Sequence, residues 1–337
     1  MSITIKDIAK MANVSTASVS RVLNNPEKVK ADTRAVIEDI IKKNNFKPNA
    51  LARGLLKNAT NTIGVVIPDI NNLFYPAVIR GIEDYFEQMN YNIFLCNTDI
   101  KIEKEIKYVN TLLEKRVDGI LFLGTRPVDQ SKSNHIKALS ERIPVLIIND
   151  TILGSKVYSV VTDEIEGAYK IVKYLLELGH TRIAHITGDS EYSTYQNKKE
   201  GYLTALGEHH IKLGDDYIIK DVPYPEGGYR AAMKLLDMAG APTAIFTASD
   251  QIAVGVIKAV FEKGYRIPED ISIAGYANIP MSGYLYPELT TVDQFPYETG
   301  RIAAETLYKL INGEKLMQKR IILEPQLLIR KSCGVPK

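Results

Sequence analysis

The spacing of apolar residues predicts that the chain begins with a short amphipathic helix. Ile5, Ile8 and Ala12 recur at intervals of three and four, so they would share one face of a helix over residues 5–12. Thr4 stands directly before this segment, where a hydroxyl can accept a backbone N–H of the first turn. The polar residues between these positions would then face solvent.

A second helical segment follows after a tight turn, and the two together predict a helix-turn-helix. Ser15 is placed to cap a helix over residues 16–23. Val19 and Val22 of that helix would pack against the first one. A third apolar stripe predicts another helix that ends before Pro48, because the residue before a proline disfavours helical conformation. In a helix-turn-helix, the second helix enters the major groove of DNA with its N-terminus first.

The polar face of the second helix carries residue types suited to reading bases. Small side chains at its start would let the helix approach base edges closely, and Arg21 can offer two donors to the O6 and N7 atoms of guanine. Neighbouring hydroxyl and amide groups can bond phosphate oxygens and fix the register. The residues expected to contact DNA in this region are Thr4, Ser15, Thr16, Ala17, Ser18, Ser20, Arg21 and Asn24. A generic helical hairpin with a solvated polar face is the alternative.

Beyond about residue 62, short apolar runs alternate with amphipathic segments. Apolar runs bounded by turn residues are typical of strands buried on both faces, and their alternation with helices predicts parallel, doubly wound sheets. The alternation restarts after Val160, so we expect two α/β lobes. The expected strands are residues 63–68, 91–96, 119–123 and 145–148 in the first lobe, and 183–186, 216–219, 244–247 and 271–275 in the second.

The distribution of charge supports a nucleic-acid partner for the N-terminal segment. Residues 1–60 hold 11 Lys and Arg against 5 Asp and Glu, whereas the other 277 residues hold 31 against 35. A basic segment on an otherwise slightly acidic protein is the electrostatic signature of a protein that binds DNA phosphates. A solvated surface can carry the same charge, so this observation gains weight only beside the helix-turn-helix.

The composition disfavours several classes of protein. No run of 18 apolar residues suggests a transmembrane helix, and the first residues lack the apolar core of a signal peptide, so we expect a cytoplasmic, nucleoid-associated protein without a membrane partner. Cys96 and Cys333 lie far apart and the five histidines are scattered, so we expect neither a disulfide framework nor a metal or other cofactor. No phosphate-binding glycine loop, nucleophile elbow or Ser-His-Asp arrangement points to an enzyme.

Residues 4–55 resemble the DNA-binding headpiece of the lactose/galactose repressor family. The matching pieces are TIKDIA at 4–9, VS at 14–15, VSRVLN at 19–24 and PNALARGL at 48–55. The resemblance implies a hinge helix over about residues 49–57 that folds only on operator DNA. The DNA contacts that it implies there are Asn49, Ala52 and Leu55. Leu55 would wedge into a minor-groove base step and kink the duplex.

The rest of the chain resembles the two-lobed core that this family shares with periplasmic sugar-binding proteins. The matching pieces are DINNLFY at 69–75, RVDGI at 116–120, LGHTRIA at 178–184, DQIAVG at 250–255 and PELTTV at 287–292. The resemblance implies a homodimer whose lobes close around an effector, and closure decides whether the hinge helices can form. The chain would cross between the lobes near Val161, Thr290 and Arg320.

These features give a complete expectation for the fold. It is an α/β protein with an N-terminal all-α helix-turn-helix headpiece and hinge helix, followed by two doubly wound parallel-sheet lobes of periplasmic-binding-protein type. The expected boundaries are a headpiece at 1–58 and a core at 59–337, with a first lobe at about 61–160 and 291–319 and a second at about 161–289 and 321–332.

The cleft between the lobes is the expected effector site, because ligands of open α/β sheets bind beyond the carboxyl ends of the strands. The residues expected there are Asn71, Phe74, Asn149, Tyr195, Lys198, Tyr224, Ser249, Asp250 and Tyr276. Asp250 could instead cap the helix that follows it, and Phe74 and Tyr224 could be packing residues rather than a stacking surface for a ligand.

Three cleft positions depart from what is usual in sugar-binding members of the family. Lys198 stands where arginine is common, and Ser249 where asparagine is common. Ala277 replaces an aspartate that accepts bonds from ligand hydroxyls or ring N–H groups. Lysine is a point charge and cannot replace the bidentate fork of arginine. We therefore expect a different ligand, for instance an anionic one drawn by Lys198. One alternative is an empty cleft with control by a protein co-regulator. The other is that Asn278 compensates for Ala277.

The sequence thus predicts a dimeric transcription repressor that reads a near-palindromic operator and is gated by a small-molecule effector, such as a sugar, a sugar phosphate or another metabolite. Gating by a protein co-regulator, as in catabolite-control members of the family, is the alternative. A sugar-binding receptor would share the core, but it would not need a helix-turn-helix.

Overall fold

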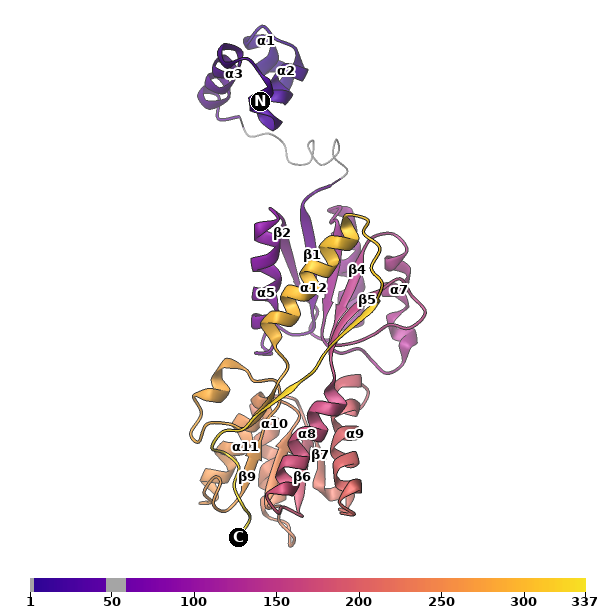
Figure 1. Ribbon diagram of the computed structural model, residues 1–337, viewed down its shortest axis with the longest axis vertical. Coiled ribbons are helices and arrows are strands. Elements are labelled where there is room, and N and C mark those ends of the chain that lie inside the picture. The colour runs from indigo at the N-terminus through magenta and orange to yellow at the C-terminus, as the bar shows by residue number, and fades with distance from the viewer. Residues whose placement is uncertain (1–2, 47–58) are drawn as a thin grey trace. The chain divides into compact units, whose positions relative to one another are not determined.

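The computed structural model describes residues 3–46 and 59–337, and the chain divides into two compact units between Asn61 and Thr62. The first unit is helical and the second is α/β (Figure 1). None of the helices in the described ranges is long and apolar enough to cross a membrane. The expected hinge helix at 49–57 lies outside the described residues.

The first unit packs short helices around a small apolar core. Its elements are α1 (Ile5–Met11), α2 (Thr16–Asn24), a 3-10 turn (Pro26–Lys28) and α3 (Ala31–Lys43). Ile8, Val19 and Ile37, one from each α-helix, are fully buried where the helices meet. The helical periodicity expected from the sequence is confirmed.

Side chains at the first two helix starts fix where these helices begin. The hydroxyl oxygen of Thr4 accepts the backbone N–H of Asp7, and the Asp7 carboxylate accepts the backbone N–H of Thr4. Ser15 caps α2 by accepting the backbone N–H of Ser18 at 3.1 Å. Both expected caps are therefore confirmed, and the turn between α1 and α2 is set by local hydrogen bonds.

A six-stranded sheet forms the centre of the first lobe, with the strand order β11-β5-β4-β3-β1-β2. Its strands are β1 (Thr62–Ile67), β2 (Asn92–Asn97), β3 (Gly119–Leu123), β4 (Val145–Ile148), β5 (Tyr158–Thr162) and β11 (Arg320–Leu323). Every neighbouring pair is parallel. In the central register, Val65 of β1 lies beside Leu95 of β2 and Leu121 of β3.

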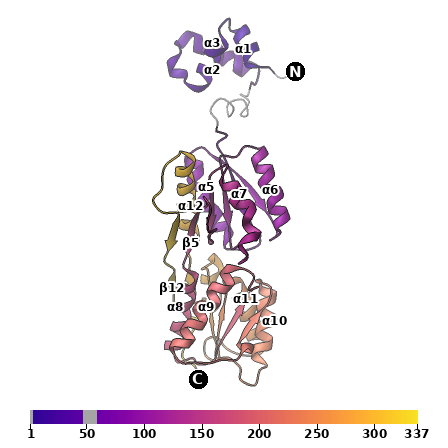
Figure 2. The ribbon, with the colours of Figure 1, turned by 90° about the vertical axis from the view of Figure 1, so that its right-hand side faces the viewer.

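Helices cover both faces of this sheet, so its strands are buried on two sides. The helices are α5 (Tyr75–Gln88) and α12 (Pro296–Ile311) on one face, and α6 (Ile102–Glu114) and α7 (Asn134–Ser140) on the other (Figure 2). Val65 belongs to the apolar layer under α5, whereas Val66 belongs to the layer under α6. Successive strand residues point to opposite faces. Parallel strands with helices packed on both faces confirm the doubly wound arrangement.

The second lobe repeats these three layers around a four-stranded parallel sheet of order β7-β6-β8-β9. The strands are β6 (Ile183–Thr187), β7 (Ile218–Lys220), β8 (Ala244–Thr247) and β9 (Ser272–Ala274). The helices are α8 (Glu164–Glu177) and α9 (Ser193–Glu208) on one face, and α10 (Pro225–Leu236) and α11 (Asp250–Glu262) on the other. The strand expected at 216–219 starts two residues later, after a 3-10 turn at Asp215–Tyr217.

The chain passes between the lobes at three places, which are the connections β5–α8, β10–α12 and β11–β12 (Figure 1). At these crossings, β10 (Thr291–Asp293) and β12 (Gln326–Leu328) form a short antiparallel ladder. The assignment of residues 321–323 to the second lobe is wrong, because β11 pairs in parallel with β5 and extends the first sheet through Leu323. The third crossing therefore follows Leu323 and is not at Arg320.

Candidate DNA-binding helix and interlobe cleft

The N-terminal part of α2 presents a small polar surface. Val19 and Val22 are buried in the helical core, and Thr16, Ala17 and Arg21 are exposed. The N-terminus of a helix carries a partial positive charge, and the first turn of α2 contains no acidic residue. The N-terminal end of α2 and the side chain of Arg21 can therefore contact the same negatively charged partner.

The other residues expected at this surface have different placements. Ser15 is exposed and Ser18 is half-buried, and their hydroxyl oxygens lie 3.0 Å apart. Thr4 is exposed, but its hydroxyl already donates to the Asp7 carboxylate at 2.6 Å. Ser20 is half-buried. The described residues do not include Asn49, Ala52 or Leu55, nor the side chain of Asn24.

The interlobe cleft is a cavity of about 90 Å³ that residues of both lobes line. Five of the nine expected effector residues line it: Phe74 and Asn149 from the first lobe, and Tyr195, Lys198 and Ser249 from the second. Asn149 follows β4 and Ser249 follows β8 closely, as expected for a site beyond the strand ends. Ser249 also caps α11 by accepting the backbone N–H three residues later. Within the described ranges, no cluster of His, Cys, Asp and Glu side chains is arranged to hold a metal ion.

Asp250 and Tyr276 do not line the cleft, because both side chains are fully buried within the second lobe. The Asp250 carboxylate accepts the hydroxyls of Ser282 and Thr291, each at 2.6 Å. It also accepts the backbone N–H of Ile279 at 2.9 Å. Burial raises the pKa of Asp250, and the hydrogen bonds from these hydroxyls oppose that rise. Asp250 therefore organises the segment between β9 and β10 rather than facing a ligand.

Asn71 and Tyr224 lie where the two lobes bond directly beside the cleft. The Tyr224 hydroxyl of the second lobe donates to the Asp69 carboxylate of the first. The Gln251 side chain on α11 accepts the Leu73 N–H at 3.0 Å and donates to the Asn71 carbonyl at 3.2 Å. Asn71 and Tyr224, which the sequence predicted as ligand contacts, thus take part in joining the lobes.

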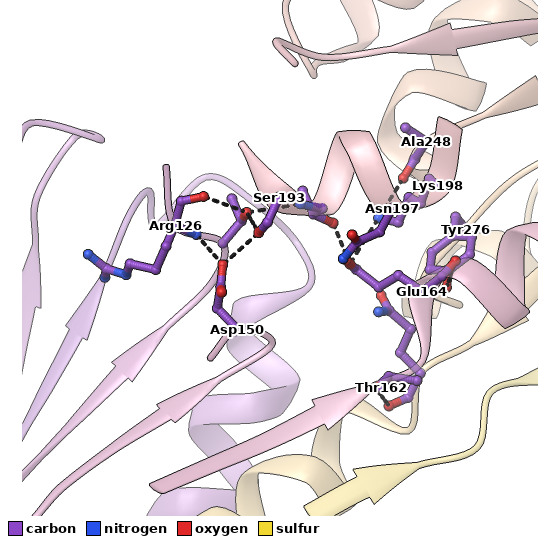
Figure 3. A network of polar contacts seen from close by, with 12 residues as sticks. Arg126, Asp150, Thr162, Glu164, Ser193, Asn197, Lys198, Ala248 and Tyr276 are labelled. Carbon is purple, nitrogen blue, oxygen red and sulfur yellow. Dashed lines mark hydrogen bonds and ion pairs between the residues drawn. The ribbon is translucent and has the colours of Figure 1, made fainter. Parts of the chain in front are cut away.

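A second set of interlobe contacts surrounds Asp150 (Figure 3). Its carboxylate accepts the Ser193 hydroxyl from α9 and the backbone N–H of Arg126, both at 2.6 Å. The Ser193 N–H donates in turn to the Arg126 carbonyl at 3.1 Å. Burial raises the pKa of Asp150, and the hydrogen bond from Ser193 opposes that rise. Both lobes therefore supply the hydrogen bonds that hold this carboxylate.

The side chain of Arg126 turns away from these contacts into a buried charge cluster of the first lobe (Figure 3). Its terminal nitrogens donate to the Glu105 carboxylate at 2.7 and 2.8 Å, and His135 Nε2 lies 2.7 Å from the same carboxylate. Burial alone would raise the pKa of Glu105, but the hydrogen bond with His135 and the charge of Arg126 outweigh it and lower the pKa to about 2. The cluster anchors the segment whose backbone meets Asp150.

Lys198 lines the cleft, but protein groups surround its ammonium (Figure 3). Its Nζ donates to the Ala248 carbonyl at 3.1 Å and lies 3.5 Å from Glu164 Oε1. The Tyr276 ring centre is 4.3 Å away. Burial lowers the pKa of Lys198, and the charge of Glu164 opposes that change. The cation expected to draw an anionic ligand therefore already has a partner.

Ala277 lines the cleft in a backbone conformation that is rare for a residue with a side chain. Its φ is 105°, whereas L-residues pay roughly 1–2 kcal/mol for left-handed conformations that glycine adopts freely. Asn278 does not line the cleft, so it does not replace the missing aspartate there. Its amide instead donates to Asp293 at 2.9 Å and accepts from Arg330 at 2.8 Å.

We expect Ala277→Gly to raise the free energy of unfolding by about 1 kcal/mol, because glycine removes the strain at positive φ. Urea denaturation followed by circular dichroism measures the change. Ala248→Gly is the matched control, since Ala248 lines the same cleft without a positive φ and should lose stability. A loss of stability in both variants would contradict the strain at Ala277.

Glu164 and Gln294 are among the lining residues that the sequence did not predict. Glu164 stands two residues after β5, so the strand-end rule could have found it, whereas Gln294 follows β10, which belongs to the antiparallel ladder of the crossings and not to a parallel sheet. Gln294 is only 3% exposed, and its Nε2 has no hydrogen-bond partner among the described residues. Oδ1 of Asn149 also lacks a hydrogen-bond partner among the described residues. Buried polar atoms without partners are rare in folded proteins, so these two atoms set the cleft wall apart from the rest of the core.

Comparison with known proteins places both units. Residues 4–49 match the family model described as bacterial regulatory proteins, lacI family, and residues 172–333 match a periplasmic binding protein-like domain. Catabolite control protein A of Priestia megaterium is 36% identical and covers 98% of this chain and 99% of its own length. The HTH-type transcriptional repressor PurR of Pasteurella multocida is 37% identical, with 98% of each chain covered.

A solved structure extends the match to three dimensions. The Lac repressor dimer bound to operator and the anti-inducer ONPF is similar with a TM-score of 0.89 at 26% identity, over 99% of this chain and 100% of that one. The matched relatives are transcription regulators, and the likeness runs through the helical unit and both lobes. The chain therefore belongs to the lacI family of bacterial regulatory proteins.

Proposed function

We propose that this lacI-family regulator is a transcription repressor that binds a near-palindromic operator as a dimer and is gated by a small molecule in the interlobe cleft. One observation carries the proposal: a capped, exposed α2 on a basic helical unit is joined to a core whose cleft is lined by polar and aromatic side chains of both lobes. The PurR relative is a transcriptional repressor and the similar Lac repressor structure is a dimer bound to operator, which supports DNA binding and dimerisation. The protein would act in the cytoplasm, at the nucleoid.

The DNA contacts that we propose centre on α2. The small side chains of Thr16, Ala17 and Ser18 would let α2 approach base edges in the major groove, where Arg21 would bond guanine. The Ser15 and Ser20 hydroxyls would bond phosphates. Thr4 and Asn24 would add backbone contacts, while Asn49, Ala52 and Leu55 would act in the minor groove through the hinge segment. Two headpieces of a dimer would read half-sites about one helical turn apart, which makes the operator a near-palindrome.

Arg21→Ala should weaken operator binding by about 1–3 kcal/mol and relax base preference at one position of each half-site, because a bidentate contact to guanine is lost. Fluorescence anisotropy with operator and random duplexes at fixed salt measures both effects. Lys42→Ala is the control, since Lys42 is an exposed basic residue of α3 outside the proposed contacts. Equal losses on both duplexes would mean that Arg21 contacts phosphate only.

The effector contacts that we propose are Phe74, Asn149, Tyr195, Ser249 and Gln294, while Lys198 and Glu164 form a charged pair in the wall of the cleft. Asn71 and Tyr224 would respond to the ligand indirectly, since they belong to the interlobe contacts. Asp250 and Tyr276 would support the cleft from behind. A ligand that bonds groups of both lobes favours one interlobe arrangement over the other, and this differential affinity is what can shift DNA binding.

Selection of bound sequences from random DNA tests this function, with the purified protein alone and with a panel of sugars, sugar phosphates and purines. An enriched palindrome whose recovery changes with one compound would establish an effector-gated regulator. A palindrome that no compound affects would favour a protein co-regulator. The absence of any enriched sequence would refute the DNA-binding function itself.

A further inference from the structure

The cleft contains one buried cation whose bonding capacity is fully used by the protein. An ammonium group has three N–H donors. Those of Lys198 have three protein partners within reach, namely the Ala248 carbonyl at 3.1 Å, the Glu164 carboxylate at 3.5 Å and the face of the Tyr276 ring at 4.3 Å. A ligand could therefore reach the ammonium only by displacing one of them.

Glu164 is arranged to remain paired with this cation. The Thr194 hydroxyl and the Asn197 amide also donate to its carboxylate, the latter at 3.2 Å. The Lys198 and Glu164 side chains are 8% and 5% exposed, so solvent screens their attraction little. Among the described residues that line the cleft, these two are the charged ones, and their charges cancel.

The groups left for a ligand are neutral. Asn72, Asn149 and Gln294 line it with amide groups, and Ser249 with a hydroxyl. Phe74 and Tyr195 line the same cavity with aromatic rings. A site with balanced charge and a lining of neutral polar and aromatic groups suits an uncharged polar molecule, whereas an anion would be buried there without a counter-charge.

We propose that the cleft selects an uncharged polar ligand, and that Glu164 is the specificity residue that excludes anions by neutralising Lys198. The inference rests on the proposed function, because it assigns the chemical class of the effector in the same cleft. It differs from the expectation that Lys198 would draw an anionic ligand. The residue that decides this lies 34 positions earlier, at the start of α8.

Titration of inorganic sulfate into the full chain without DNA, at constant ionic strength, tests the role of Glu164. Glu164→Gln keeps the size and most hydrogen bonds of the side chain and removes its charge. We expect saturable sulfate binding at least tenfold tighter than in the parent protein, and its loss in Glu164→Gln/Lys198→Met. Glu166→Gln is the matched control on the same helix, since Glu166 pairs with Lys170 instead.

A buried ammonium without a counter-charge can release its proton, so the titration is repeated in Glu164→Gln/Lys198→Arg, in which the charge is permanent. No gain in either background would overturn the role of Glu164. Saturable sulfate binding to the parent protein that Lys198→Met abolishes would overturn the neutrality of the cleft. These results are independent of operator selection: a chain that selects no operator refutes the repressor, whereas an anionic effector bound through Lys198 refutes only this inference.

Discussion

Replacing Glu105 by alanine is expected to lower the free energy of unfolding by about 3–5 kcal/mol, because the guanidinium of Arg126 then stays buried without its counter-charge. The pair is bidentate, at 2.7 and 2.8 Å, and its side chains are only 7% and 6% exposed. His135 loses its partner in the same step. Urea denaturation followed by circular dichroism measures the loss, since the chain contains no tryptophan.

The double variant Glu105→Leu/Arg126→Met separates charge from packing. It removes both buried charges while keeping apolar volume, so we expect it to recover most of the stability lost in Glu105→Ala. If the double variant is as unstable as the single one, the shape of the site matters more than its charge. Arg126 also bonds Asp150 and Ser193 through its backbone, so Glu105→Ala should loosen the interlobe contacts as well.

The same cluster sets a pH dependence with a definite sign. The pKa of Glu105 in the folded chain is about 2, below its ordinary value of 4.5. The carboxylate therefore stabilises the fold fully above about pH 4.5, and this contribution disappears as the pH falls towards 2. Acid titration of stability should be flatter over that interval in the double variant than in the parent chain.

The elements that local signals determine were predictable from the sequence. The helical spacing of Ile8 and Val19 and the hydroxyls of Thr4 and Ser15 are short-range features, and the structure uses them as expected. The alternation of apolar runs and amphipathic helices likewise predicts the layers of both lobes. The boundary of the first lobe near Arg320 was not predictable from local signals, because β11 joins the first sheet by pairing with β5, about 160 residues earlier in the chain.

The cleft was only partly predictable, because the direction of a side chain is not written in its position along the chain. Ser249 and Asp250 are neighbours after β8, yet Ser249 lines the cleft and Asp250 points into the second lobe. Lys198 looked like a free cation for the same reason. Its partner Glu164 comes from a different helix, and only the packing of α8 against α9 brings the two together.

Asp250→Ala should lower the free energy of unfolding by about 3 kcal/mol or more, although its neighbour Ser249 is the one that lines the cleft. The substitution leaves the Ser282 and Thr291 hydroxyls and the Ile279 N–H without their acceptor, and each buried donor left unpaired costs about 1–3 kcal/mol. Urea denaturation measures the loss.

Ser249→Ala provides the contrast, since removing a helix cap costs typically about 1 kcal/mol. If Asp250 only contacted a ligand, its replacement by alanine would change stability little and weaken effector binding strongly. Thr291 belongs to β10, which precedes the connection to α12, so losing its bond to Asp250 should also weaken the coupling between the lobes. A stable Asp250→Ala protein that has lost only its effector response would restore Asp250 to the ligand site.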